Sequence, residues 1–221
     1  MNMLNEIMNF MDLRTMVKFK IAALLFVGAL SCTAQEITPQ QLREEVYVEN
    51  QVFKVWYNEV YEQPMKLIYT STNRPKNVDR GSMDFHTEKA VHTSDKADYY
   101  RNIYDKGHLA PAATYSDTQE NLYTTFSYLN CALQDQYLNR GEWRLLEEEE
   151  RKWDDTSNLT VTVDLIFEEG HIVLSTGGHV PTRMVKHVYF DKTGSYKCFD
   201  FPNEKPAKGW EEFQVNHNHV R

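Results

Sequence analysis

Alternating hydrophobic and polar residues mark several short stretches of the chain, and a spacing of two is typical of β-strands with one buried face. These stretches are rich in valine, threonine and aromatic residues, which favour strands. The predicted strands are residues 52–57, 65–70, 124–130, 159–167, 187–190 and 197–201. The last two flank Asp191-Lys192-Thr193-Gly194, a turn sequence that predicts a hairpin. The pattern therefore predicts a sheet whose strands are mostly antiparallel.

One stretch carries hydrophobic residues at helical spacing among many charges. Residues 137–153 form the strongest predicted helix, and a weaker amphipathic pattern over residues 35–48 predicts an arm or a first helix. The fold class is therefore predicted to be α+β, with a mixed, mostly antiparallel sheet and one principal helix. The 221 residues fit a single domain with a sizeable core.

The first 34 residues have the composition of a secretory signal peptide. Lys18 and Lys20 precede a ten-residue apolar run over residues 21–30, and Ser31-Cys32-Thr33-Ala34 supplies the small residues that a signal peptidase needs. An apolar run of this length is too short to span a bilayer. We therefore predict a signal peptide over residues 1–34 and a mature domain over residues 35–221.

Two features of this leader leave alternatives open. The polar start of the chain favours Met16 as the true initiator. Cleavage after Ala34 would release the protein to the periplasm or the medium, which is the favoured interpretation. Cleavage before Cys32 would instead leave a lipid-anchored cysteine, although Leu30 is bulky for that signal.

Net charge and cysteine content restrict the possible functions only slightly. The formal net charge of −8 disfavours a tight nucleic-acid binder, because such affinity comes mostly from lysine and arginine. It does not exclude an enzyme that holds a few phosphates locally with the help of a divalent cation. Cys131 and Cys198 remain after the leader, and both a disulfide and two buried thiols are consistent with an exported protein.

Side chains suited to catalysis concentrate between Asp105 and Glu147. His108 follows a glycine in a segment too polar to be core, and a neutral imidazole can accept a proton from water. Asn139, Trp143 and Glu147 are spaced four residues apart, so in an α-helix they share one face. An amide oxygen suits Mg²⁺, and a nearby carboxylate can hold the waters of that ion. These are the parts of a metal-assisted phosphodiesterase.

Two arginines in the polar segment 73–98 are candidates for contact with a phosphate. Arg74 and Arg80 could each reach a substrate, although a solvated arginine is the commoner role. Long irregular segments inside a domain are often functional.

The order of these residues resembles that of the DNA/RNA non-specific endonucleases, endonuclease G-like enzymes of the ββα-metal (His-Me finger) group. The matching segments are Asp105-Lys106-Gly107-His108-Leu109-Ala110-Pro111-Ala112-Ala113, then Ser127-Tyr128-Leu129-Asn130, Gln134, and the run from Asn139 to Glu147. Weaker similarity reaches from residue 57 to residue 203, so it covers most of the mature chain.

The resemblance implies a role for each matching residue. It implies His108 as general base, Asn139 as the sole direct metal ligand and Glu147 as the carboxylate that holds metal-bound water. Asn130 would be an amide on the substrate side, with Asp105 and Lys106 also beside the substrate. Arg80 would be the phosphate-binding arginine, with Arg74 as the alternative. It also implies a ββα-metal finger that carries the active site. The implied reaction is cleavage of DNA and RNA with Mg²⁺, or Mn²⁺ as a candidate substitute, leaving 5′-phosphate ends.

Two departures from the family pattern stand out. Lys106 stands where the family commonly has arginine, and Cys131-Ala132-Leu133 precedes Gln134 where a proline is usual. The change to lysine keeps the charge but loses the fork of donors. Lys106 and the acidic net charge support a rival hypothesis, a catalytically inactive relative that binds nucleic acid or a protein. No stable protein partner is predicted from the sequence.

Overall fold

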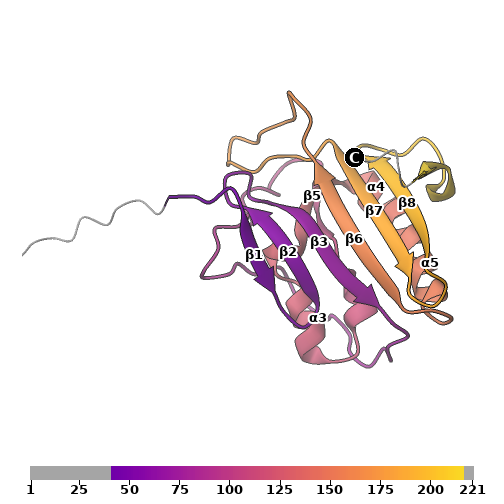
Figure 1. The fold of residues 1–221 in the computed structure, drawn as a ribbon. Helices are drawn as coiled ribbons and strands as arrows, with labels where there is room; N and C mark the ends of the chain where they lie inside the picture. The colour runs from indigo at the N-terminus through magenta and orange to yellow at the C-terminus, as the bar shows by residue number, and fades with distance from the viewer. Residues whose placement is uncertain (1–40, 217–221) are drawn as a thin grey trace, which may run out of the picture. The chain divides into compact units, whose positions relative to one another are not determined.

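The computed structural model describes residues 41–216, and a large antiparallel sheet is the main feature of this part of the chain (Figure 1). The strands of this sheet are β1 (Val46–Glu49), β2 (Phe53–Asn58), β3 (Gln63–Ser71), β6 (Leu159–Ile166), β7 (Arg183–Phe190), β8 (Ser195–Pro202) and β9 (Gln214–Val215). Their spatial order is β1-β2-β3-β6-β7-β8-β9, and every neighbouring pair is antiparallel. The predicted α+β class with a mostly antiparallel sheet is confirmed.

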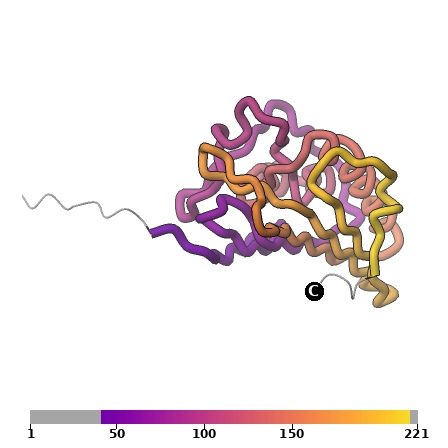
Figure 2. Tube along the Cα trace, turned by 90° about the horizontal axis from the view of Figure 1, so that it is seen from above, coloured from indigo at the N-terminus to yellow at the C-terminus, as the bar shows by residue number. Residues whose placement is uncertain are grey.

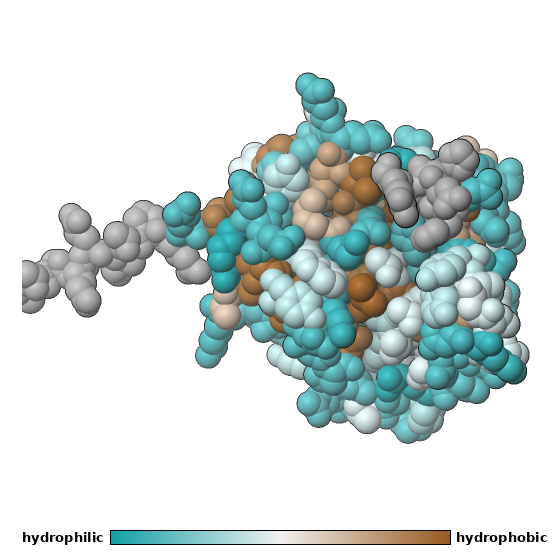
Figure 3. Space-filling view, viewed as in Figure 1, coloured by the Kyte–Doolittle hydropathy of each residue, from teal (hydrophilic) through white to brown (hydrophobic). Residues whose placement is uncertain are grey.

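The alternation along β6 explains why one face of the sheet is covered. Val161 and Val163 are fully buried, whereas the intervening Thr160 and Thr162 are only partly buried. Successive side chains of a strand point to opposite faces, so the valines face the core. The opposite face is mainly hydrophilic with scattered hydrophobic patches (Figure 3).

Helical segments cover the inner face of the sheet (Figure 2). They are the 3₁₀ turn η1 (Ala112–Tyr115), α3 (Gln119–Thr125), the 3₁₀ turn η2 (Tyr128–Asn130), α4 (Gln136–Leu138), the π-helical turn η3 (Asn139–Trp143) and α5 (Arg144–Trp153), with a later 3₁₀ turn η4 (Trp210–Phe213). Trp143 and Leu146 are buried, and the Trp143 ring packs edge-on against Phe201 of β8 at 5.7 Å between centroids. This contact joins the helical segment to the sheet.

A separate two-stranded ribbon carries His108. It pairs β4 (Tyr104–His108) with β5 (Cys131–Asp135) in antiparallel register, so that Gly107 lies opposite Ala132. The ribbon explains the glycine, because a Cβ at position 107 would lie 2.2 Å from Oε1 of Gln134. Gly107 thus leaves room for the Gln134 side chain.

The predicted helix over residues 137–153 is interrupted. A π-helical turn separates α4 from α5, and Gly141 within it has φ −107° and ψ −111°. Glycine adopts such backbone angles at little steric cost. The interruption shifts the helix phase between Asn139 and Glu147.

Two other predictions are wrong. The segment predicted as strand 124–130 instead ends α3 and forms η2, because the Thr118 side chain caps α3 by accepting from the Asn121 backbone N–H. The strand of this region is β5, which begins at Cys131, directly after the predicted segment. Part of the predicted arm or first helix over residues 35–48 is strand β1, and residues 35–40 lie outside the described residues.

Cys131 and Cys198 are buried free thiols, so the disulfide interpretation is wrong and the alternative holds. Within residues 41–216, no helix has the length and apolar character needed to cross a membrane. The predicted leader, with Met16 and Cys32, lies outside the described residues, and the domain boundary at residue 35 stays a prediction.

Candidate active site

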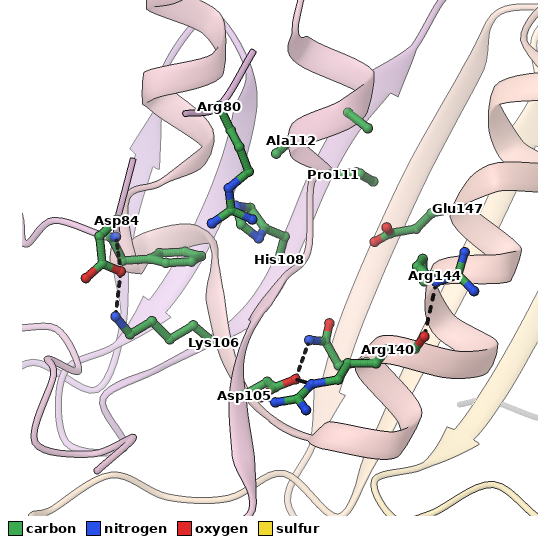
Figure 4. A pocket seen from close by; sticks show the side chains of 13 residues that line it. Arg80, Asp84, Asp105, Lys106, His108, Pro111, Ala112, Arg140, Arg144 and Glu147 are labelled. Carbon is green, nitrogen blue, oxygen red and sulfur yellow. Dashed lines mark hydrogen bonds and ion pairs between the residues drawn. The ribbon is translucent and has the colours of Figure 1, made fainter. Parts of the chain in front are cut away.

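A cavity of about 710 Å³ lies between the β4 ribbon and the helical segment that contains Asn139 (Figure 4). His108 and Asn139 both line it. Its charged lining residues are four cations and three acids: Arg80, Lys106, Arg140, Arg144, Asp84, Asp105 and Glu147. The local balance is therefore one positive charge, in contrast to −8 for the whole chain. The acidic composition is not concentrated where a phosphate would bind.

His108 lies at the end of β4 in aromatic surroundings. Its ring centroid is 4.5 Å from that of Phe85 and 4.9 Å from that of Phe126, with the Phe126 ring nearly perpendicular. Its Nε2 is buried and has no hydrogen-bond partner among the described residues. Burial of the ring, aided by the positive charge of Arg80, lowers the pKa of His108 to about 3. The imidazole is therefore neutral at physiological pH.

Of the two candidate arginines, only Arg80 reaches the cavity. Its guanidinium carbon lies 4.9 Å from the centroid of the Phe126 ring, and its side chain extends toward His108 (Figure 4). Arg74 instead pairs with Asp117 at 3.0 Å and does not line this cavity. The geometry favours Arg80 over Arg74 as the arginine nearest the candidate base.

Lys106 lines the cavity on the same side. Its Nζ lies 2.6 Å from Oδ1 of Asp84. A hydrogen bond from Lys106 is the main reason that the pKa of Asp84 falls to about 2. Lys106 therefore enters the cavity already paired with a carboxylate.

Three linked side chains join β4 to the opposite, helical wall. Nδ2 of Asn139 donates to Oδ2 of Asp105 at 2.9 Å. Arg140 donates to both oxygens of the same carboxylate, from Nε at 2.7 Å and from Nη2 at 2.6 Å. Asp105, which was expected beside the substrate, is thus bonded to the candidate metal ligand and to its neighbour.

Glu147 completes this wall as a half-buried carboxylate. Burial raises its pKa to about 7, although the positive charges of Lys186 and Arg151 oppose the shift. A nearby cation would stabilise its ionised form. The carboxylate is therefore suited to a site that also contains a metal ion.

The prediction that Asn139, Trp143 and Glu147 share one face is only partly right. Asn139 and Glu147 line the cavity, whereas the Trp143 side chain is 1% exposed and belongs to the core. The π-helical turn has hydrogen bonds between residues five apart, which widens the turn and changes the direction of the side chains.

A buried ion pair lies under this wall. Nζ of Lys186 is 2.8 Å from Oε1 of Glu150, and both side chains are almost completely buried. The Tyr69 hydroxyl donates to the other oxygen of Glu150 at 2.6 Å, and Lys186 lies 4.1 Å from the centroid of the Trp143 ring. Glu150 is the buried member of the glutamate run 147–150, whose other three residues are partly exposed.

Asn130 is not brought to the cavity. Its side chain is fully buried and bonded to the backbone: Oδ1 accepts from Ala110 N–H at 2.7 Å, and Nδ2 donates to the carbonyls of Ala110 and Thr125. These bonds hold the segment that follows His108. The geometry therefore gives Asn130 a supporting place rather than the expected position at the substrate.

The sequence model for the DNA/RNA non-specific endonucleases matches residues 33–221. The chain belongs to this family. It is 38% identical to mitochondrial endonuclease G of Bos taurus over 92 residues, which cover 40% of this chain and 31% of the bovine protein. It is 37% identical to the Homo sapiens enzyme over 76 residues, or 33% of this chain and 26% of the human protein. Each match spans less than a third of the relative.

A solved structure extends the likeness in fold. The crystal structure of the EndoG/EndoGI complex contains a chain with a TM-score of 0.71 and 23% identity, covering 79% of this chain and 81% of that one. At this level of identity, the match shows that the two chains share a fold and shows nothing further.

The cavity also contains candidate functional residues that were not predicted from the sequence. Arg140 follows Asn139 directly, and Arg144 precedes Glu147 by three residues, which places neighbouring side chains together on a helix. That spacing could have identified Arg144. Phe85 carried no such signal, because its contact with His108 depends on the folding of the long irregular segment.

The oxygen donors of the cavity fit a hard divalent cation. The described residues contain no group of three or more histidine, cysteine, aspartate or glutamate side chains that could hold a metal ion. Oδ1 of Asn139 is not used in the bond to Asp105, and the Glu147 carboxylate lines the same cavity. Mg²⁺ keeps several waters and needs few protein ligands, so this sparse donor set suits it.

Proposed function

We propose that this protein is an exported, sequence-non-specific endonuclease that hydrolyses phosphodiester bonds of DNA and RNA with Mg²⁺. The observation that carries the proposal is the cavity in which a neutral His108 faces Asn139 and Glu147, with Arg80 beside the histidine. Family membership supports the same reaction class.

In the proposed mechanism, His108 acts as the general base. Its uncharged imidazole, which lines the cavity, accepts a proton from the attacking water. The aromatic rings around it exclude solvent, which keeps the base unprotonated before the reaction. Arg80 places positive charge where the scissile phosphate would become more negative.

The opposite wall would hold the cation. Asn139 would contribute its amide oxygen, and Glu147 would accept hydrogen bonds from the waters of the ion. Mg²⁺ at this position would stabilise the negative charge on the phosphate and the leaving oxygen. Arg140 and Arg144 add positive charge on this wall, which favours approach of a polyanion.

The proposal of export rests on the leader sequence. Cleavage after Ala34 would leave a mature N-terminus at Gln35, whereas lipidation would leave the chain beginning at Cys32. Mass spectrometry of the protein recovered from cell fractions distinguishes these two forms.

The proposed reaction is tested with the purified mature protein and three substrates: supercoiled plasmid, linear DNA and RNA. All three should be degraded with Mg²⁺ or Mn²⁺, and EDTA should stop the reaction. Plasmid should be nicked and linearised before small fragments accumulate, because cleavage is internal. A protein that is folded yet inert with both ions would contradict the proposal and favour the inactive relative.

A further inference from the structure

The Asp105 carboxylate connects two neighbouring side chains of the helical wall. One oxygen accepts from Asn139 and from Arg140, and the other oxygen accepts from Arg140 alone. The Arg140 side chain is 67% exposed and that of Asp105 is 20% exposed. The two hydrogen bonds from the largely exposed Arg140 side chain thus hold the mostly buried Asp105 carboxylate in one orientation.

The orientation of the Asn139 amide depends on that carboxylate. The oxygen and nitrogen ends of an amide have nearly the same shape, and only the nitrogen can donate to a carboxylate. The bond from Nδ2 to Asp105 therefore directs Nδ2 toward Asp105 and leaves Oδ1 available. The helix backbone alone does not fix this geometry, because Asn139 begins the irregular π-helical turn.

We infer that Arg140 is a positioning residue, which acts through Asp105 to hold the Asn139 amide with its oxygen available to a divalent cation. The inference rests on the proposed function for the identity of the cation site, and it adds a residue that no motif assigned. Arg140 need not touch the metal or the substrate for this role.

Arg140→Gln provides a decisive test, because two explanations predict opposite signs. Removing a positive charge beside a cation site should by itself tighten binding. Loss of positioning should weaken it, and changes to residues that orient a metal ligand commonly cost about 10–100-fold in affinity. We expect Mn²⁺, titrated without nucleic acid and followed by electron paramagnetic resonance, to bind roughly tenfold more weakly to Arg140→Gln.

Two variants separate geometry from charge. Arg144→Gln is the matched control, since Arg144 lines the same cavity but pairs with Glu148 rather than Asp105. Its Mn²⁺ affinity should equal or slightly exceed that of the wild type. Arg140→Lys keeps the charge but lacks the fork of donors, so it should also bind more weakly than the wild type.

A double variant tests the route of the effect. If Arg140 acts through Asp105, Arg140→Gln should weaken Mn²⁺ binding much less in an Asp105→Asn background than in the wild type. Full additivity of the two losses would overturn the inference.

The remaining outcomes are also distinguishable. Arg140→Gln that binds Mn²⁺ as tightly as the wild type, or more tightly, would overturn the inference, as would a wild type that does not bind Mn²⁺. A wild type that binds Mn²⁺ with the expected dependence on Arg140, but cleaves no nucleic acid, would contradict only the proposed function. Thermal unfolding of each variant confirms that it is folded.

Discussion

The two walls of the cavity differ in how they prepare their side chains. The strand wall, which β4 forms, surrounds His108 with aromatic rings and gives Nε2 no partner among the described residues. The helix wall is polar, and Asn139 is bonded to a carboxylate that an arginine also holds. One wall thus keeps its imidazole neutral by desolvation, and the other orients an amide by hydrogen bonding.

The same desolvation acts on both walls with opposite effects on the pKa. Burial lowers the pKa of His108 to about 3 and raises that of Glu147 to about 7, because it disfavours the charged form of each group. Neutrality lets the imidazole accept a proton, while the same burial makes it a weaker base. For the carboxylate, a cation bound nearby would oppose the shift and favour the ionised form.

The largest expected effect concerns the strand wall. His108→Ala should reduce cleavage by about 10²–10⁴-fold, since the variant lacks the proposed general base. The measurement is the initial rate of plasmid nicking with Mg²⁺, with circular dichroism as a check on folding. A folded variant that retained the wild-type rate would remove His108 from the mechanism.

The next largest expected effect is a loss of folding stability when the support beneath the helix wall is removed. Lys186→Met leaves Glu150 buried without its ion pair, and removing one member of such a pair typically costs about 3–5 kcal/mol. The free energy of unfolding from urea titration measures this cost. Arg144→Gln is the control, because the exposed Arg144–Glu148 pair should contribute about 1 kcal/mol or less. Equal losses in the two variants would contradict the assignment of a buried support beneath this wall.

A smaller effect should depend on pH. The folded pKa of Glu147 lies above the ordinary value of 4.5, so the stability associated with its protonation is present at low pH and is lost as pH rises through about 7. Glu147→Gln should therefore be more stable than the wild type at pH 8, by on the order of 1–2 kcal/mol, and the difference should shrink at pH 5.

The comparison for Glu147→Gln requires EDTA, because a bound cation would favour the ionised carboxylate of the wild type. Thermal unfolding at the two pH values measures the difference. An advantage for the variant that is no larger at pH 8 than at pH 5 would show that burial does not govern this carboxylate.

The sequence predicted much of the sheet because alternation reports directly on a half-buried strand. Residues 159–167 illustrate this, as β6 covers nearly the same range. Residues 124–130 show the limit, since their β-forming composition was overridden by the Thr118 cap and the packing around Asn130. The β propensity of residues 124–130 reports neither the upstream cap nor the packing around Asn130.

The candidate site was predicted unevenly for a similar reason. His108, Asn139 and Glu147 could be found from motif order, and the structure brings them to one cavity. The backbone bonds of Asn130 and the two bonds from Arg140 to Asp105 join residues far apart in the chain. Helical spacing assumes a regular helix, so it could not foresee the π-helical turn that buries Trp143.

The most direct test of the central claim compares two variants by two measurements. His108→Ala and Asn139→Ala are each assayed for Mn²⁺ affinity without nucleic acid and for cleavage of plasmid with Mn²⁺. The division of roles predicts that both variants lose cleavage, whereas only Asn139→Ala loses Mn²⁺ binding. Equal loss of Mn²⁺ binding in His108→Ala, or wild-type affinity in Asn139→Ala, would contradict the account.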